Sequence, residues 1–423
     1  MSALPPRARL GVLLAAVALV LAGAIWLLVL RGGDDEPVVE AGSRFGNEDR
    51  GGGGGSLLDT LTPVLGARRQ VRSGGADPSA PSADDLRRAP GDAVAGLFAV
   101  GFRGTRPEGT FFERLGARPY GAVLLGNQNY EQPQQLAALT AKIYDVARDA
   151  DHPAPIVAAP QEGDEFSAFP NLAPDGQVDV GARKTREMQA SARAAGEQLK
   201  ALGVGLTLAP NADVAVAGGP GQGRAFADTP RRVARAVKAS VAGYREAGIA
   251  SAVSPFPGDG AASQDPSSGP APVGLGLEEL RDGDMTPFQA VADGSGAAPA
   301  IQMSNAIYVA FDSVTPATLL PEAVKELRDR FGFEGTIVSA DLVATTATTG
   351  GSVGDAAVAA LKAGVDMLVV PGGRAQQDEA YRAVVAAVSS GAIPADRVVS
   401  SLKRIASLRR LTREAREPIQ IDG

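Results

Sequence analysis

Asp341 is the residue whose type and position in the sequence most clearly indicate chemistry. It ends a short apolar run, residues 335–342 (GTIVSADL), in which small and β-branched residues precede one carboxylate. This pattern predicts a buried strand with a carboxylate at its C-terminal end, which is where barrel enzymes carry their catalytic groups. A carboxylate in that position can act as a nucleophile. The structural alternative is that Asp341 caps the helix that follows the strand.

A proton donor is harder to find in this sequence. The 423 residues include one histidine, His152, which lies far from the other polar motifs, and no cysteine. Histidine is the side chain that ordinarily titrates near neutral pH. The absence of cysteine excludes disulfides, thiolate chemistry and cysteine-based zinc sites. The sequence therefore indicates a hydrolase-like site that retains a nucleophile and lacks the usual proton donor.

The elements that must position Asp341 alternate regularly along the chain. Eight short apolar runs, each followed by a turn and a helix-length segment, are typical of a parallel sheet that is covered on both faces. Their number and spacing predict an α/β fold of the (β/α)8 TIM-barrel type. An open doubly wound sheet is the alternative, but the glycines of residues 101–109 (GFRGTRPEG) have the wrong spacing for a dinucleotide-binding loop. The predicted strands are residues 97–102, 121–126, 156–160, 204–210, 250–255, 300–305, 336–341 and 366–371.

Amphipathic and alanine-rich segments between these runs predict the helices. The last one, residues 393–411, is rich in Arg and Leu, and we expect it to close the barrel from outside rather than to bind a ligand. The other predicted helices are residues 134–148, 182–202, 230–247, 321–331, 354–363 and 377–390.

The overall charge excludes one class of partner. The formal net charge is −7, the sequence pI is about 5.1, and no basic block exceeds short arginine pairs. Nucleic-acid-binding domains carry a concentrated basic surface, so no nucleic-acid partner is expected. The carboxylates near the predicted site also lack a ligand-like spacing, so neither a metal ion nor another cofactor is expected.

The N-terminal part of the chain predicts a membrane tether. Residues 10–30 contain no charged side chain and are long enough to span a bilayer as a helix. The arginines before this span place residues 1–9 in the cytoplasm and the barrel outside the membrane. Residues 31–90, rich in Gly, Ser, Pro, Asp and Arg, predict a flexible low-complexity linker. A cleaved signal peptide and a secreted protein is the alternative.

Several segments, taken in order, resemble glycoside hydrolase family 3, in particular its single-domain β-N-acetylhexosaminidases. The resemblance covers about residues 90–413, and it places the barrel domain at residues 91–415 and a tail at residues 416–423. The segments that carry it are LFAVGFRGTRP, GAVLLGNQNYEQPQQLAALTAKI, PIVAAPQEGDEF, GLTLAPNADV, GRAFADTP, SPFPGDG and FDSVTPATLLPEAVKELRDRFGFEGTIVSADL.

The resemblance assigns roles to a few residues and reveals departures from the family pattern. It implies that Asp341 is the nucleophile and that Arg224 contacts the sugar. The family's acid/base histidine, in an Asp-Ser-His loop, falls at Ser267 in the sequence Asp265-Pro266-Ser267. The remaining departures are Pro160 for a substrate-binding Asp, Asp164 for a Gly, Ser254 and Pro255 for a Lys-His pair, Asp259 for a His, and Ser304 and Asn305 for an Ala-His pair.

Three acidic residues, Asp259, Asp265 and Glu162, are candidates for the missing acid. A carboxyl group whose pKa is raised by burial can donate a proton near neutral pH. Each also has a structural interpretation: Asp259 as a turn residue, Asp265 as a loop or helix cap, and Glu162 as a hydrogen-bond partner inside the barrel. Glu162 and Asn305 are further candidates for substrate binding.

Two functions of different class follow. The first is a retaining glycosidase that hydrolyses O-glycosyl bonds in β-N-acetylhexosaminides or related β-glycosides, as the resemblance implies, with peptidoglycan-derived carbohydrate as one such partner. The second is a pseudoenzyme that binds a glycan or a partner protein without cleaving it. Loss of the family's histidines favours the second, and the resemblance to the family favours the first.

Overall fold

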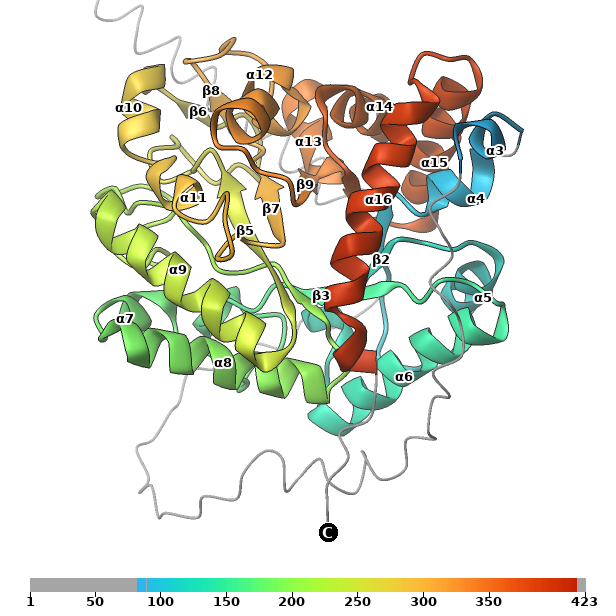
Figure 1. Cartoon of the computed structure of the whole chain (residues 1–423), viewed down its shortest axis with the longest axis horizontal. Helices are drawn as coiled ribbons and strands as arrows, with labels where there is room; N and C mark the ends of the chain where they lie inside the picture. The colour runs from blue at the N-terminus through green and yellow to red at the C-terminus, as the bar shows by residue number, and fades with distance from the viewer. Residues whose placement is uncertain (1–81, 89, 417–423) are drawn as a thin grey trace, which may run out of the picture. The chain divides into compact units, whose positions relative to one another are not determined.

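The computed structural model describes residues 82–88 and 90–416, which all belong to one compact unit. Its centre is a closed barrel of eight parallel strands, so the predicted fold is confirmed (Figure 1). Around the barrel the order is β1-β10-β9-β7-β5-β4-β3-β2, and pairing of β1 with β10 closes it. The strands are β1 (Phe98–Gly101), β2 (Ala122–Leu124), β3 (Ile156–Ala159), β4 (Leu206–Thr207), β5 (Ala250–Phe256), β7 (Ala300–Met303), β9 (Thr336–Asp341) and β10 (Met367–Val370).

All eight predicted runs form barrel strands. Every residue of β1, β2, β3, β4 and β10 is buried, because side chains on one face fill the barrel and those on the other pack against helices. β4 is much shorter than its predicted run. A single bridge between Asn211 and Ser254 continues its pairing with β5 further along the two chain segments.

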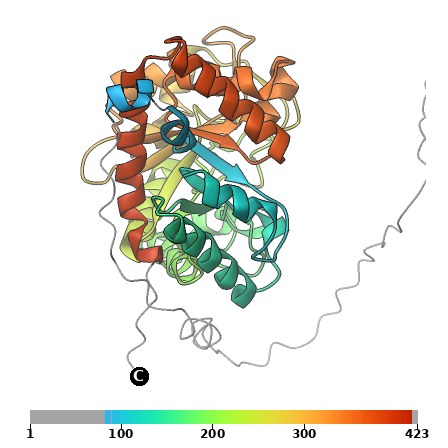
Figure 2. The same cartoon turned by 90° about the vertical axis from the view of Figure 1, so that its right-hand side faces the viewer.

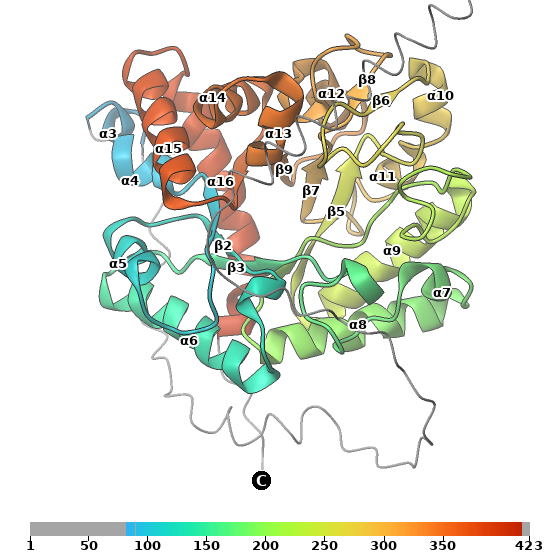
Figure 3. The ribbon, with the colours of Figure 1, turned by 180° about the vertical axis from the view of Figure 1, so that it is seen from behind.

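The predicted helices also form, with ends that differ by a few residues. Figures 1 and 3 show α8 and α9 lying side by side on the outside of the barrel. A side chain at Gly243 of α9 would lie 2.3 Å from the backbone oxygen of Gln189 in α8, so glycine permits this close approach. The helices are α6 (Pro133–Asp149), α8 (Thr185–Ala201), α9 (Pro230–Ala247), α12 (Pro321–Lys325) with a π-helical turn (Glu326–Arg330), α14 (Val353–Ala363), α15 (Arg374–Ser389) and α16 (Ala395–Leu411).

Several short elements were not predicted. They lie mostly in the loops that follow the strands, and a two-stranded parallel sheet of β6 (Pro272–Val273) and β8 (Ile307–Tyr308) stands beside the barrel. The unpredicted helices are α4 (Pro90–Ala95), α5 (Thr110–Ala117), α7 (Gln177–Gly181), α10 (Leu277–Asp282), α11 (Thr286–Gln289) and α13 (Leu342–Thr349).

The last part of the predicted linker, residues 31–90, lies within the described residues. A helix, α3 (Ala83–Arg88), lies within the expected linker, and its Leu86 is fully buried. α3 packs against α4 and α16, so the N-terminal and C-terminal helices of the described region lie together (Figure 2). Burial of this apolar side chain gives the segment tertiary contacts that its composition did not reveal.

The predicted membrane span, residues 10–30, lies outside the described residues, as do the rest of the N-terminal region up to residue 81 and residues 417–423. Among residues 82–88 and 90–416, no helix combines the length and apolar character needed to cross a bilayer.

Candidate active site

Asp341 ends β9 and is also the N-cap of α13. Its Oδ1 accepts hydrogen bonds from the backbone N–H groups of Val343 (2.8 Å) and Ala344 (3.2 Å). Burial raises the pKa of Asp341, and these two hydrogen bonds act in the opposite direction. Among the described residues, Oδ2 has no hydrogen-bond partner, so one carboxylate oxygen serves as the cap and the other remains for chemistry.

Asn305 follows β7 and fixes the backbone of Asp341. Its side-chain Nδ2 donates to the carbonyl oxygen of Asp341 (3.1 Å), and its Oδ1 accepts from the hydroxyl of Thr345 (2.6 Å). The side chain is buried. In this structure Asn305, a predicted substrate ligand, therefore connects β7 to the end of β9 and to α13.

Arg224 and Glu162 form a bidentate ion pair beside the ends of β3 and β4. Nε and Nη2 of Arg224 each lie 2.5 Å from a carboxylate oxygen of Glu162. Glu162 is 2% exposed and Arg224 is 36% exposed, and the guanidinium also lies over the ring of Phe166. Burial alone would lower the pKa of Arg224, but Glu162 raises it above its ordinary value. The arginine is thus a fixed cation with one accessible side.

Gln177 of α7 holds the backbone of Arg224 and that of Asn211, which follows β4. Its Nε2 donates to the carbonyl oxygens of Asn211 and Arg224, both at 3.0 Å, and its Oε1 accepts from the backbone N–H of Asn211 (2.9 Å). The segment after β4 and the loop that carries Arg224 are therefore tied together.

Asp259 lies in the turn that follows β5, and three elements hold it. Its Oδ1 accepts hydrogen bonds from the hydroxyls of Ser304 (2.5 Å) and Tyr308 (2.8 Å), while its backbone N–H donates to Asp213 (2.6 Å). Burial raises the pKa of Asp259 to about 7, and the neighbouring Asp213 contributes to this rise. A carboxyl group that titrates there can donate or accept a proton at neutral pH.

Two further carboxyl groups lie close to Asp259. Asp213, after β4, is 2% exposed and accepts from Nδ2 of Asn211 (3.0 Å) as well as from Asp259. Asp284, after α10, is 5% exposed, and its Oδ1 has no hydrogen-bond partner among the described residues. Burial raises the pKa of Asp284 to about 7, and the charge of Asp213 adds to this effect.

Asp265 lies apart from these groups in the structure. It is exposed on the loop between β5 and β6, where its Oδ1 accepts from the backbone N–H of Ser267 (2.8 Å). Ser267 is exposed too. Within the described residues, Asp265 has no hydrogen bond or ion pair with any other candidate residue, and its observed role is to cap a turn.

The consecutive residues Ser304 and Asn305 connect the two groups best placed for chemistry. Ser304 bonds the side chain of Asp259, and Asn305 bonds the backbone of Asp341. The end of β7 thus stands between the loop after β5 and the end of β9, as the strand order requires. In the part of the chain that the structure describes, no group of three or more carboxylate or histidine side chains could hold a metal ion.

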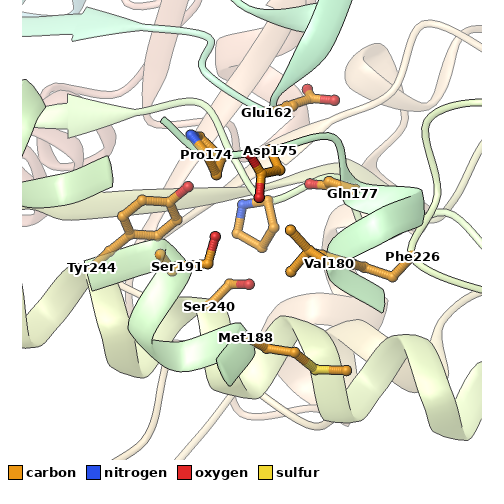
Figure 4. Close-up of a pocket in the computed structure, with 12 residues that line it drawn as sticks. Glu162, Pro174, Asp175, Gln177, Val180, Met188, Ser191, Phe226, Ser240 and Tyr244 are labelled. Carbon is orange, nitrogen blue, oxygen red and sulfur yellow. The ribbon is translucent and has the colours of Figure 1, made fainter. Parts of the chain in front are cut away.

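A small pocket lies behind Glu162, between α7, α8 and α9 (Figure 4). The hydroxyls of Ser191, Ser240 and Tyr244 point into it, and Val180, Met188 and Phe226 supply apolar walls. Neither Asp341 nor Asp259 lines it. The pocket therefore adjoins the Arg224–Glu162 pair and does not include the two candidate catalytic carboxyl groups.

Sequence reasoning missed Asp213, Tyr308, Gln177 and Asp284. One signal was present for Asp213: it follows a predicted strand in the segment APNADV, and polar residues after barrel strands are candidates for the site. Nothing in the sequence distinguishes Tyr308 or Gln177 from ordinary core or loop residues.

Comparisons with known proteins agree with this architecture. The sequence pattern of the glycosyl hydrolase family 3 N-terminal domain matches residues 93–408. A β-hexosaminidase from Methylococcus capsulatus is 32% identical over 263 residues, which are 59% of this chain and 75% of that protein. Another, from Alkalilimnicola ehrlichii, is 30% identical over 294 residues, covering 66% of this chain and 81% of that protein.

Solved structures give the same result. A family 3 β-N-acetylglucosaminidase from a Paenibacillus species superposes with a TM-score of 0.72 and 27% identity, over 77% of this chain and 62% of that one. A β-N-acetylhexosaminidase from Beutenbergia cavernae gives a TM-score of 0.68 and 28% identity, over 76% of this chain and 98% of that one. The chain therefore belongs to glycosyl hydrolase family 3, through the N-terminal barrel domain of that family.

Proposed function

We propose that this protein is a retaining glycoside hydrolase that acts on β-N-acetylhexosaminides or related β-glycosides. Membership of the family and the activity named for its relatives support this. The observation that carries the proposal is local: Asp259, a carboxyl group with a pKa of about 7, and Asp341 are held by the adjacent residues Ser304 and Asn305.

Asp341 is the nucleophile in this proposal. Its Oδ2 attacks the anomeric carbon while the bond from that carbon to the leaving oxygen breaks. The α13 N-terminus holds Oδ1, and its partial positive charge stabilises the carboxylate form that must attack. Arg224, with its accessible side, binds a hydroxyl or carbonyl oxygen of the sugar, and Glu162 fixes its orientation.

Asp259 is the general acid. Its proton passes to the departing oxygen in the first step, and in the second step the resulting carboxylate takes a proton from the water that releases the sugar from Asp341. Of the other two candidates, Asp265 is exposed and caps a turn, and Glu162 is paired with Arg224.

Hydrolysis of 2,4-dinitrophenyl β-N-acetylglucosaminide and a panel of other dinitrophenyl β-glycosides by the full-length chain tests the proposal. This leaving group departs without a proton, so release of dinitrophenolate requires only the nucleophile. We expect turnover of the N-acetylhexosaminides. Binding of chitin oligosaccharides or cell-wall fragments without turnover of any glycoside would instead identify a glycan-binding protein that has lost the family's chemistry.

Replacing Asp259 by Asn should separate substrates by their leaving groups. The expected loss in kcat/KM is about 100- to 10,000-fold for unactivated glycosides, the usual contribution of a general acid. The dinitrophenyl substrate should react in the first step nearly as fast as with the parent. The matched control is Asp265→Asn, which should leave both substrates unaffected. Equal loss on both substrates would show that Asp259 is not the acid.

The pH dependence of kcat/KM should also differ between unactivated glycosides and the dinitrophenyl substrate. The acid must be protonated, and the pKa of Asp259 is about 7, so kcat/KM for unactivated glycosides should fall as pH rises above about 7. Asp341 must be ionised, so activity on all substrates should fall at acidic pH. The dinitrophenyl substrate should lack the alkaline fall. An identical profile for both substrate types contradicts the assignment of Asp259.

The surroundings of the reaction are also part of the proposal. The apolar span of residues 10–30 supports a barrel anchored to the membrane by one helix and working outside it, with peptidoglycan-derived carbohydrate as its substrate. Fractionation of cells that express the full-length chain, with protease added from outside, tests this location.

A further inference from the structure

We propose that Asp213 is a positioning residue that controls the ionisation of the Asp259 carboxyl and fixes the turn that carries it. The inference rests on the proposed role of Asp259 as the proton donor. Asp213 would act on the reaction only through Asp259, without contacting the substrate. The evidence for it is the set of hydrogen bonds between the segment after β4, which carries Asp213, and the segment after β5, which carries Asp259.

The two segments are bonded along their length. The backbone N–H of Ala212 donates to the oxygen of Ser254 (2.6 Å), and that of Ser254 donates to the oxygen of Pro210 (3.1 Å). This pairing extends the β4–β5 ladder beyond the short β4 and brings Asp213 opposite the turn at Asp259. The distance of 2.6 Å from Oδ1 of Asp213 to the backbone nitrogen of Asp259 is the result.

Glycines on both sides of Asp259 permit this close packing. A side chain at Gly260 would lie 2.0 Å from the backbone oxygen of Val214, and one at Gly258 would lie 2.8 Å from Cβ of Asp284. Gly258 also has a φ of 124°, which other residues rarely adopt. The turn is therefore held between residues 213–214 and Asp284, and Asp259 has little freedom to move away from Asp213.

The hydrogen bonds assign the charge within the pair. Each oxygen of Asp213 accepts from an N–H group, one on Asp259 and one on Asn211, and an N–H group cannot accept a proton in return. The partners of Asp259 are the hydroxyls of Ser304 and Tyr308, which can rotate. Tyr308 can donate to the oxygen of Gly258 (2.9 Å) instead, and its own oxygen then accepts a proton from Asp259. The proton of the pair therefore resides on Asp259, and Asp213 is the carboxylate.

Other charged groups around the pair do not remove this effect. Burial raises the pKa of both aspartates, and Arg224 acts in the opposite direction. Arg224 is itself paired with Glu162, whose negative charge opposes its effect on Asp213. Asp284 adds a further acidic group beside Asp213, and Tyr308 remains a neutral phenol because burial raises its pKa. Arg224 interacts with three carboxyl groups, those of Glu162, Asp213 and Asp259, so one positive charge cannot balance all of them and a proton on Asp259 is favoured.

The experiment is a carboxyl NMR titration of the full-length chain labelled with 13C at aspartate Cγ, with signals assigned by their loss in Asp259→Asn and Asp213→Asn. In the parent, Asp259 should titrate near pH 7 and Asp213 should stay ionised over that range. In Asp213→Asn, which keeps an oxygen to accept from the Asp259 N–H, the Asp259 midpoint should fall by about one to two pH units, because the like charge is gone. Asp282→Asn, which removes an exposed negative charge at the C-terminal end of α10, should leave the midpoint unchanged.

The kinetic consequence is specific. In Asp213→Asn, the alkaline fall in kcat/KM for unactivated glycosides should move to lower pH by the same amount, and the dinitrophenyl substrate should be unaffected. A folded Asp213→Asn variant with an unchanged Asp259 midpoint overturns the proposal. So does a parent in which Asp213, and not Asp259, takes up the proton near pH 7. Absence of turnover in the parent would defeat the proposed function, while the titration would still decide whether Asp213 controls Asp259.

Discussion

Asp341→Asn should abolish hydrolysis of the dinitrophenyl β-N-acetylhexosaminide, with a fall in kcat of about 10⁴-fold or more, the scale on which loss of a nucleophile ordinarily acts. The expected loss is chemical and not structural. Asn is as good an N-cap as Asp, and its side-chain oxygen can accept the same hydrogen bonds from Val343 and Ala344. An amide oxygen does not form the glycosyl-enzyme bond that a carboxylate forms.

The controls for this variant must separate the two roles of Asp341, as the proposed nucleophile and as the N-cap of α13. Asp341→Ser retains a capping oxygen and also lacks the carboxylate, so it should be equally inactive. The melting temperatures of both variants should stay close to that of the parent. Undiminished turnover by a folded Asp341→Asn would show that Asp341 is only a helix cap and that another group attacks the sugar.

The strands could be predicted from the sequence because burial on both faces produces continuous apolar runs. The run at residues 336–341 and the helix over residues 230–247 agree with β9 and α9 to the residue. α13 could not be predicted in the same way. Its sequence, LVATTATT, is rich in threonine, which has low helix propensity. The Asp341 cap at one end and Gly350, with a φ of 67°, at the other define this helix in the fold.

The candidate site was predictable only in part. From the sequence, Asp259 is interpreted as a turn residue and Asp265 as a loop residue or helix cap, and the sequence alone offers no means to rank the two as the acid. In the structure the glycines around Asp259 let two other segments pack against it, whereas Asp265 stays in water. Asp213 meets Asp259 across 46 residues of chain, and such a contact depends on the order of strands in the barrel, which no local pattern encodes.

The opposite end of the barrel carries another buried acidic residue, Asp366, immediately before β10. It is fully buried, and its carboxylate accepts hydrogen bonds from three arginines. The closest donor is Arg328, whose pKa falls to about 10 because burial outweighs the attraction of Asp366 and the other two arginines repel it. The donors to the carboxylate are Arg328 (2.6 Å), Arg397 (3.2 Å), Arg404 (3.3 Å), Ser401 (3.0 Å) and the backbone N–H of Ile337 (3.0 Å).

Asp366→Asn should therefore destabilise the protein strongly, by about 3–5 kcal/mol, because it leaves partly buried guanidinium groups without their anion. Differential scanning calorimetry of the full-length chain should show a fall in melting temperature of several degrees. The matched control is Glu197→Gln, which removes an exposed ion pair with Arg193 on α8 and should leave the melting temperature unchanged. If Asp366→Asn melts with the parent, the three arginines are held by their carbonyl and hydroxyl partners alone. If it melts as expected, one carboxylate fastens β9, β10 and α16 together at the end of the barrel away from Asp341.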